Sequence, residues 1–184
     1  LYQAKFDTED WSGSVQAFQI SLDASLATTP TWDAKDKIDK QDYSSERAII
    51  TYNTAEDTGV AFRWPTDYLN PTSNELSSVS TTLLTNTASD KQNYGQDILN
   101  YIRGDQSQEE ETKDSSRSFR TRTSVLGDIV HSNPLYVGPP TFFFPDEWES
   151  IDGISAPENS GSKTYSQFRN DFKARSPVLY FGAN

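Results

Sequence analysis

The stretch that decides the fold is FRTRTSVLGDIVHSNPLYVG, residues 119–138. Within it, residues 124–130 and 135–137 form short apolar runs that predict two β-strands. The polar segment 131–134 separates them, and its proline restricts the residue before it to extended geometry, which is typical of a turn. The chain has no alternation of strands with long helices, so a β-rich domain is expected rather than an α/β one.

Towards the N-terminus, the pattern predicts one long strand followed by a loop. Residues 11–22 alternate apolar and polar side chains, and the phase shifts between Ala17 and Phe18. This pattern predicts a half-buried strand with a bulge or bend at the shift. Residues 23–46 are polar and predict a surface loop.

A hairpin, a last strand and several helices complete the expected elements. Residues 47–52 and 60–64 are β-rich and predict a hairpin, and residues 177–181 predict a final apolar strand. The charged stretch 106–118 predicts a polar loop. Helical spacing predicts short helices around residues 76–84, 94–103 and 164–173.

Composition excludes several classes of protein. The 184 residues carry a net charge of −11, so nucleic acid is not expected as a partner. With no Cys the chain has no disulfide and no thiol chemistry. With no Met it is expected to be a processed chain or part of a longer one. No apolar run approaches the roughly 18 residues of a membrane span, and the aromatic content of 12% favours a folded domain with long polar loops.

The residues suited to catalysis or metal binding have simpler interpretations. His131 has Asp128 and Ser132 nearby, but neighbours along a strand rarely point at one another, so a turn role is favoured over a catalytic triad. The acids at 33, 36 and 39 and those at 146–152 lack EF-hand spacing, so solvated loops are favoured over calcium binding. No catalytic residue, cofactor or metal ligand is therefore expected in this segment.

Two features are candidates for surface contact. Arg103-Gly104-Asp105 is the integrin-type adhesion tripeptide, although a helix that stops at glycine produces the same letters. Trp32 and Trp148 lie in expected loops and are candidates for exposed aromatic contacts. The other two tryptophans flank strands and are expected to pack.

Motifs spread over the whole chain resemble, in order, the C-terminal domain of the type IV pilus biogenesis and tip-adhesin family, the PilC/PilY proteins. The most specific is the segment quoted first, residues 119–138. The others are WSGSVQAF at 11–18, WDA at 32–34, RAIIT at 47–51, FRW at 62–64, YIRGD at 101–105 and PVLYFGAN at 177–184.

The resemblance implies a partial modified β-propeller, with residues 1–184 as the N-terminal portion of the propeller domain in a larger chain. It implies a non-enzymatic protein of type IV pilus assembly, adhesion and twitching motility, extracellular at the pilus tip or on the outer membrane of a Gram-negative bacterium. Its implied partners are minor pilins, the remaining propeller blades, and a host or abiotic surface. The family's calcium loop lies later in the propeller, so calcium is implied only for the intact protein. The family often carries Arg-Gly-Asp at residues 101–105, which favours the structural interpretation of the tripeptide.

Two loops depart from the family pattern, and two other classes of protein are alternatives. Residues 106–113 are unusually acidic, and residues 141–161 differ from the family. One alternative is a quinoprotein dehydrogenase-like propeller enzyme, whose calcium ligands and quinone clamp are not evident in this chain. The other is a secreted carbohydrate-binding module that uses Trp32 or Trp148. The isolated chain is expected to fold poorly, because a partial propeller leaves strand edges open.

Overall fold

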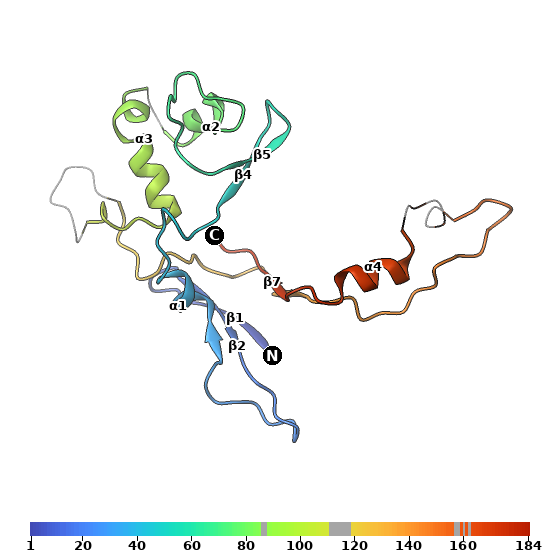
Figure 1. Cartoon of the computed structure of the whole chain (residues 1–184). Helices are drawn as coiled ribbons and strands as arrows, with labels where there is room; N and C mark the ends of the chain where they lie inside the picture. Colours follow the sequence, from blue (N-terminus) through green and yellow to red (C-terminus); the bar gives the residue numbers. More distant parts are fainter. Residues whose placement is uncertain (86–87, 111–118, 157–158, 160, 162) are drawn as a thin grey trace. The chain divides into compact units, whose positions relative to one another are not determined.

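The computed structural model describes residues 1–85, 88–110, 119–156, 159, 161 and 163–184. Two compact units are formed, one by Leu1–Val130 with Asn184 and the other by His131–Ala183. Figure 1 shows the elements of both.

The first unit begins with a three-stranded antiparallel sheet in the order β1-β2-β3. The strands are β1 (Tyr2–Phe6), β2 (Gly13–Ala17) and β3 (Trp32–Asp33). The central strand β2 is the most buried, with Val15 fully enclosed. The strand expected over residues 11–22 is shorter than predicted and ends at Ala17, at the predicted phase shift. The amide of the next residue, Phe18, donates to the carbonyl of Leu1.

The loop predicted for residues 23–46 is wrong in part, because it contains β3 and the short helix α1 (Ala34–Ile38). The side chain of Asp33 caps this helix by accepting a hydrogen bond from the amide of Lys35 at 2.9 Å. A single capped turn has too few apolar residues to produce a periodic signal, so the pattern gave no indication of it.

The predicted hairpin is confirmed as β4 (Ile50–Asn53) paired with β5 (Thr58–Ala61). Two helices follow, α2 (Ser78–Leu83) and α3 (Ala88–Arg103), close to the predicted positions. Val60, Leu76 and Leu99 form the core of this region, with Phe62, Trp64 and Leu84 packed around them.

The strand predicted at residues 124–130 is wrong. This segment has a single β-bridge among the described residues, between Ser12 and Gly127. Its other hydrogen bonds join it to several different parts of the chain. The carbonyl of Leu126 accepts from the amide of Gly13, and the carbonyl of Asp128 accepts from the amide of Asn184. Because the segment bonds several elements in turn, it joins them without becoming a strand of one sheet. A Cβ at Gly13 would overlap the Gly127 carbonyl oxygen, so this crossing requires glycine.

In the second unit, the strands predicted at residues 135–137 and 177–181 are confirmed as β6 (Leu135–Val137) and β7 (Val178–Tyr180). They pair antiparallel with each other, which the sequence did not predict. The predicted last helix is confirmed as α4 (Tyr165–Phe172), whose first turn has a capping box formed by Thr164 and Gln167. None of the described residues of this unit is buried.

The mainly β fold class is confirmed, since the described residues form three small antiparallel sheets with four helices. These sheets close no propeller within the described residues, so the partial propeller stays a prediction. No helix in the described part of the chain is long and apolar enough to cross a membrane.

Candidate functional site

The Arg-Gly-Asp tripeptide lies at the C-terminal end of α3, where its arginine points inward. The Arg103 side chain is only 3% exposed. Its guanidinium donates to the carbonyl of Phe62 at 2.7 Å and to that of Tyr43 at 2.6 Å. Arg47 donates in turn to the carbonyl of Arg103. Gly104 has a φ of +118°, and a Cβ there would overlap the Arg47 guanidinium, so the helix stops on a residue that must be glycine.

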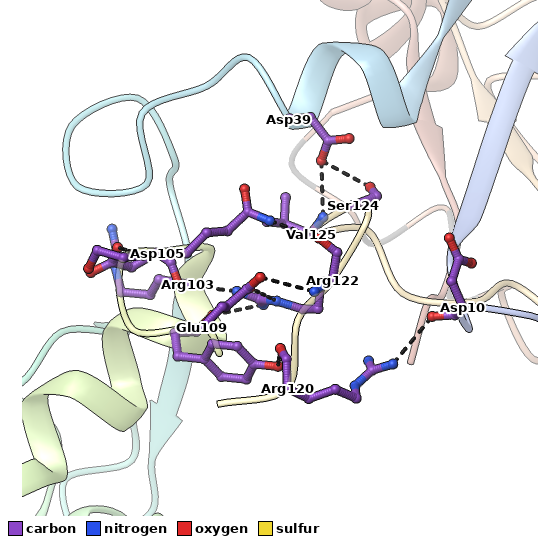
Figure 2. A network of polar contacts seen from close by, with 12 residues as sticks. Asp10, Asp39, Arg103, Asp105, Glu109, Arg120, Arg122, Ser124 and Val125 are labelled. Carbon is purple, nitrogen blue, oxygen red and sulfur yellow. Dashed lines mark hydrogen bonds and ion pairs between the residues drawn. The ribbon is translucent and has the colours of Figure 1, made fainter. Parts of the chain in front are cut away.

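A second arginine, Arg122, fixes the segment after the helix (Figure 2). It forms an ion pair with Glu109 at 2.8 Å and donates to the carbonyls of Tyr101 at 2.9 Å and Asp105 at 3.2 Å. Its guanidinium carbon lies 3.7 Å from the centre of the Tyr101 ring. The Asp105 carboxylate accepts from the amide of Ser107 at 2.9 Å. Arg122 therefore ties the end of α3 to the segment that starts at residue 119.

These contacts support the structural interpretation of the tripeptide. Receptor binding through Arg103 needs an accessible guanidinium, whereas here it is enclosed and bonded to two backbone carbonyls. The adhesion interpretation stays a prediction, because no binding partner tests it.

Two aspartates connect the polar network of Figure 2 to earlier parts of the chain, Asp39 through its carboxylate and Asp10 through its backbone carbonyl, which accepts from Arg120 at 3.3 Å. Asp39 accepts from the hydroxyl of Ser124 at 2.9 Å and from the amide of Val125 at 3.0 Å. Asp10 accepts from the hydroxyl of Thr123, and this bond, with those from Ser12, lowers the pKa of Asp10 to about 2. Hydrogen bonds to the charged form explain the direction of this pKa shift.

Some of the triad and calcium candidates form structural hydrogen bonds. The hydroxyl of Ser132 accepts from the amide of Gly182 at 2.7 Å, and the Asp128 carboxylate accepts from the side-chain amide of Asn184 at 3.0 Å. Asp33 accepts from the side chains of Ser14 and Gln16. In the described ranges, no three His, Asp or Glu side chains gather as metal ligands.

The two candidate tryptophans differ in their surroundings. Trp32 lies in β3 rather than in a loop, is half-buried, and has its ring centre 6.1 Å from that of Tyr2. Trp148 lies in the irregular segment before α4 and is 43% exposed. Of the two, Trp148 is the better placed for contact with a partner.

Trp148 contributes to an open hollow of about 410 Å³ in the second unit, here named the aromatic cleft. The centre of the Phe144 ring lies 6.3 Å from that of Trp148 and 5.1 Å from that of Tyr165, and the Tyr165 contact is edge to face. The cleft is lined by Phe144, Pro145, Asp146, Trp148, Lys163, Thr164, Tyr165 and Phe168.

Hydrogen bonds hold both sides of the aromatic cleft. The backbone of Trp148 exchanges two hydrogen bonds of 2.9 Å with the side-chain amide of Asn159. The Asp146 carboxylate accepts from the amide of Ser166, in the first turn of α4, at 2.7 Å. The Asp146 bond attaches the irregular segment to α4, and the Asn159 bonds tie the backbone of Trp148 to a later part of the same segment.

More aromatic surface lies outside the cleft. Phe142 is 71% exposed and Phe143 is 81% exposed, with the Arg169 guanidinium 3.8 Å from the centre of the Phe143 ring. Sequence reasoning named Trp148 but missed Phe144 as its neighbour. The available signal was the spacing of Tyr165 and Phe168, which gives the predicted helix an aromatic face.

Comparison with known proteins confirms the resemblance found in the motifs. The whole chain is 28% identical to the Type IV pilus biogenesis factor PilY1 of Pseudomonas aeruginosa strains UCBPP-PA14 and PAK, and 29% identical to a PilY1 homolog of Xylella fastidiosa. All of this chain is covered, but only 14%, 14% and 12% of these relatives. No family model matches the chain. No solved structure matches it either.

Proposed function

We propose that this chain is part of a non-enzymatic protein of type IV pilus assembly and surface adhesion, located at the pilus tip or on the outer surface of the cell. The observation that carries the proposal is similarity along the whole chain to proteins named Type IV pilus biogenesis factor PilY1. Two of the three triad candidates are engaged in structural hydrogen bonds, Ser132 with the amide of Gly182 and Asp128 with the side chain of Asn184, which supports a non-enzymatic role.

The arrangement of strands supports a place within a larger β domain. Among the residues that the structure describes, each of the three sheets has only two or three short strands, so its outer strands have unpaired edges. Unpaired strand edges are usually covered by further strands or by a partner. We infer that further propeller blades cover them and that minor pilins bind the assembled domain.

The aromatic cleft is the surface that we propose for contact with a host or abiotic surface. Aromatic side chains dominate the energy of many protein contacts, and an exposed apolar patch commonly marks an interaction site. Phe144 and Trp148 supply such a patch on a segment that hydrogen bonds hold in place.

The test measures pili and attachment separately in bacteria that carry altered full-length protein. Deletion of residues 1–184 is expected to reduce the number of surface pili, because assembly requires the intact domain. Trp148→Ala and Phe144→Ala are expected to leave the number of pili unchanged and to lower attachment per pilus severalfold.

Matched variants in the first unit control for the loss of an exposed ring. Trp11→Ala removes a tryptophan that is 62% exposed, and Phe6→Ala removes a phenylalanine that is 52% exposed. Both are expected to attach like wild type. Unchanged pili after the deletion would contradict a role in assembly, and unchanged attachment of the Trp148 variant would contradict contact through the aromatic cleft.

A further inference from the structure

The first unit has a polar groove. This groove shares no lining residue with the aromatic cleft, which belongs to the second unit. Its volume is about 440 Å³, within the range of about 300–1,000 Å³ that is typical of small-molecule sites. Seven described residues line this polar groove: Trp64, Pro65, Thr66, Tyr68, Gln92, Gln96 and Asp97.

One wall of the polar groove consists of two aromatic rings. The ring centres of Trp64 and Tyr68 are 6.1 Å apart, and the planes are inclined by 35°. The indole of Trp64 lies against α3 at Gly95, where a Cβ would overlap the ring. The indole therefore has a fixed position, which lowers the entropic cost of binding a ligand against it.

The loop that carries Tyr68 is held by carboxylates. Glu75 accepts from the amides of Thr66 and Thr72, each at 2.9 Å, and from the Thr72 hydroxyl at 2.9 Å. Asp67 accepts from two amides later in the same loop. The Tyr68 ring therefore lies on a loop that several hydrogen bonds stabilise.

Three polar residues that line the groove belong to α3. Gln92 and Gln96 are one helical turn apart, so they share a face of the helix, and Asp97 follows them. In the described part of the chain these three side chains have no hydrogen-bond partner. Each glutamine amide offers donors and an acceptor, and the carboxylate offers acceptors only.

We propose that this polar groove binds an uncharged saccharide. One face of a pyranose ring presents C–H groups, which suit the aromatic faces of Trp64 and Tyr68. Its hydroxyls both donate and accept, which matches the amides of Gln92 and Gln96 and the Asp97 carboxylate. Neither Lys, Arg nor His is among the seven lining residues, and the chain carries a net charge of −11, so sugars that bear a carboxylate are disfavoured.

The experiment presents the full-length protein to immobilised neutral and acidic oligosaccharides and then titrates the best neutral one by calorimetry. The intact protein is expected to select neutral oligosaccharides. Tyr68→Ala and Gln96→Ala are each expected to raise the Kd about tenfold or more, because each removes a direct contact. Near-UV circular dichroism of each variant verifies that the fold is kept.

Two variants elsewhere in the same unit are the controls. Tyr52→Ala removes an exposed tyrosine of β4, and Gln19→Ala removes an exposed glutamine. Both are expected to leave the Kd unchanged. The proposal is overturned if a folded protein binds no neutral oligosaccharide, if it prefers acidic ones, or if binding is insensitive to the groove variants. Binding that depends on Trp148 instead would locate a saccharide in the aromatic cleft and would also overturn it.

Discussion

Arg122 is the residue on which most interactions at the end of α3 converge. Its ion pair with Glu109 is enclosed, since Glu109 is only 3% exposed. Arg122→Ala is expected to lower the free energy of unfolding by about 3–5 kcal/mol, because it removes one partner of an enclosed ion pair with a buried carboxylate. Urea denaturation followed by circular dichroism measures this loss.

Arg120→Ala is the matched control for removing an arginine. Arg120 is exposed, and among the described residues its guanidinium donates to a single group, the carbonyl of Asp10, at 3.3 Å. We expect a change within about 0.5 kcal/mol for this surface substitution. Equal losses for Arg120→Ala and Arg122→Ala would contradict a specific role for the enclosed ion pair.

The lowered pKa of Glu75 predicts how the free energy of unfolding depends on pH. Hydrogen bonds from the amides of Thr66 and Thr72 lower the pKa of Glu75 from 4.5 to about 2. A folded-state pKa below the unfolded one means that its stabilising contribution is complete above about pH 4.5 and is lost as the pH falls towards 2. Glu75→Gln should therefore flatten this part of the stability curve, measured by urea denaturation at a series of pH values.

Glu56→Gln is the control for the loss of one carboxylate, since Glu56 lies in the exposed turn between β4 and β5. Its stability curve is expected to keep the slope of wild type below pH 4.5. The explanation fails if Glu75→Gln keeps that slope as well.

In the Arg-Gly-Asp tripeptide, the sequence predicted the role of one residue and not that of another. The glycine was predictable, because a helix that stops at Gly104 is a local pattern. The role of Arg103 was not, because its two acceptors lie 41 and 60 residues earlier in the chain. The pattern of residues adjacent in the sequence carries no information on contacts between residues so far apart along the chain.

At the scale of elements, the packing of α3 depends on Gly95. Helix propensity alone predicts that Gly95→Ala stabilises the protein by about 1 kcal/mol. The added Cβ would overlap the Trp64 ring, so we expect a net loss of about 1–3 kcal/mol instead. Thermal unfolding measures the loss, and a change in tryptophan fluorescence reports the displaced indole.

Gly59→Ala is the control, since the nearest atom to a Cβ there is the Thr51 carbonyl oxygen at 4.0 Å. We expect it to be neutral or slightly stabilising, because alanine loses less entropy on folding. Stabilisation by Gly95→Ala would contradict close packing of Trp64 on the helix.

Elements with a repeating pattern were predictable, and those defined by scattered contacts were not. The β4–β5 hairpin and α4 have periodic apolar residues and end signals, and both were found. Residues 124–130 have the pattern of a strand, yet they bond β2, Asp39 and Asn184 in turn. Alternation reports that a segment is extended and half-buried, but it does not report whether one partner strand runs beside it.

At the scale of the whole chain, the two units differ in how much they bury. The first unit encloses Val15, Thr81, Leu76 and Leu99 almost completely. None of the described residues in 131–183 is buried, although the sequence places six phenylalanines there. The sequence predicted apolar strands and a helix in this region, but it could not predict that they would lack a core of their own.

This difference predicts unequal protection of backbone amides in the isolated chain. Local opening costs the least free energy where few apolar groups are buried, so amides of β6, β7 and α4 are expected to exchange about 100-fold faster than those of β2 and the last turns of α3. Hydrogen exchange with mass spectrometry measures both sets in one sample. In the full-length protein the second unit should become protected, because further strands then cover its open edges. Strong and equal protection of both units in the isolated chain would show that residues 131–183 are stable by themselves, and would contradict the expectation that this chain folds poorly alone.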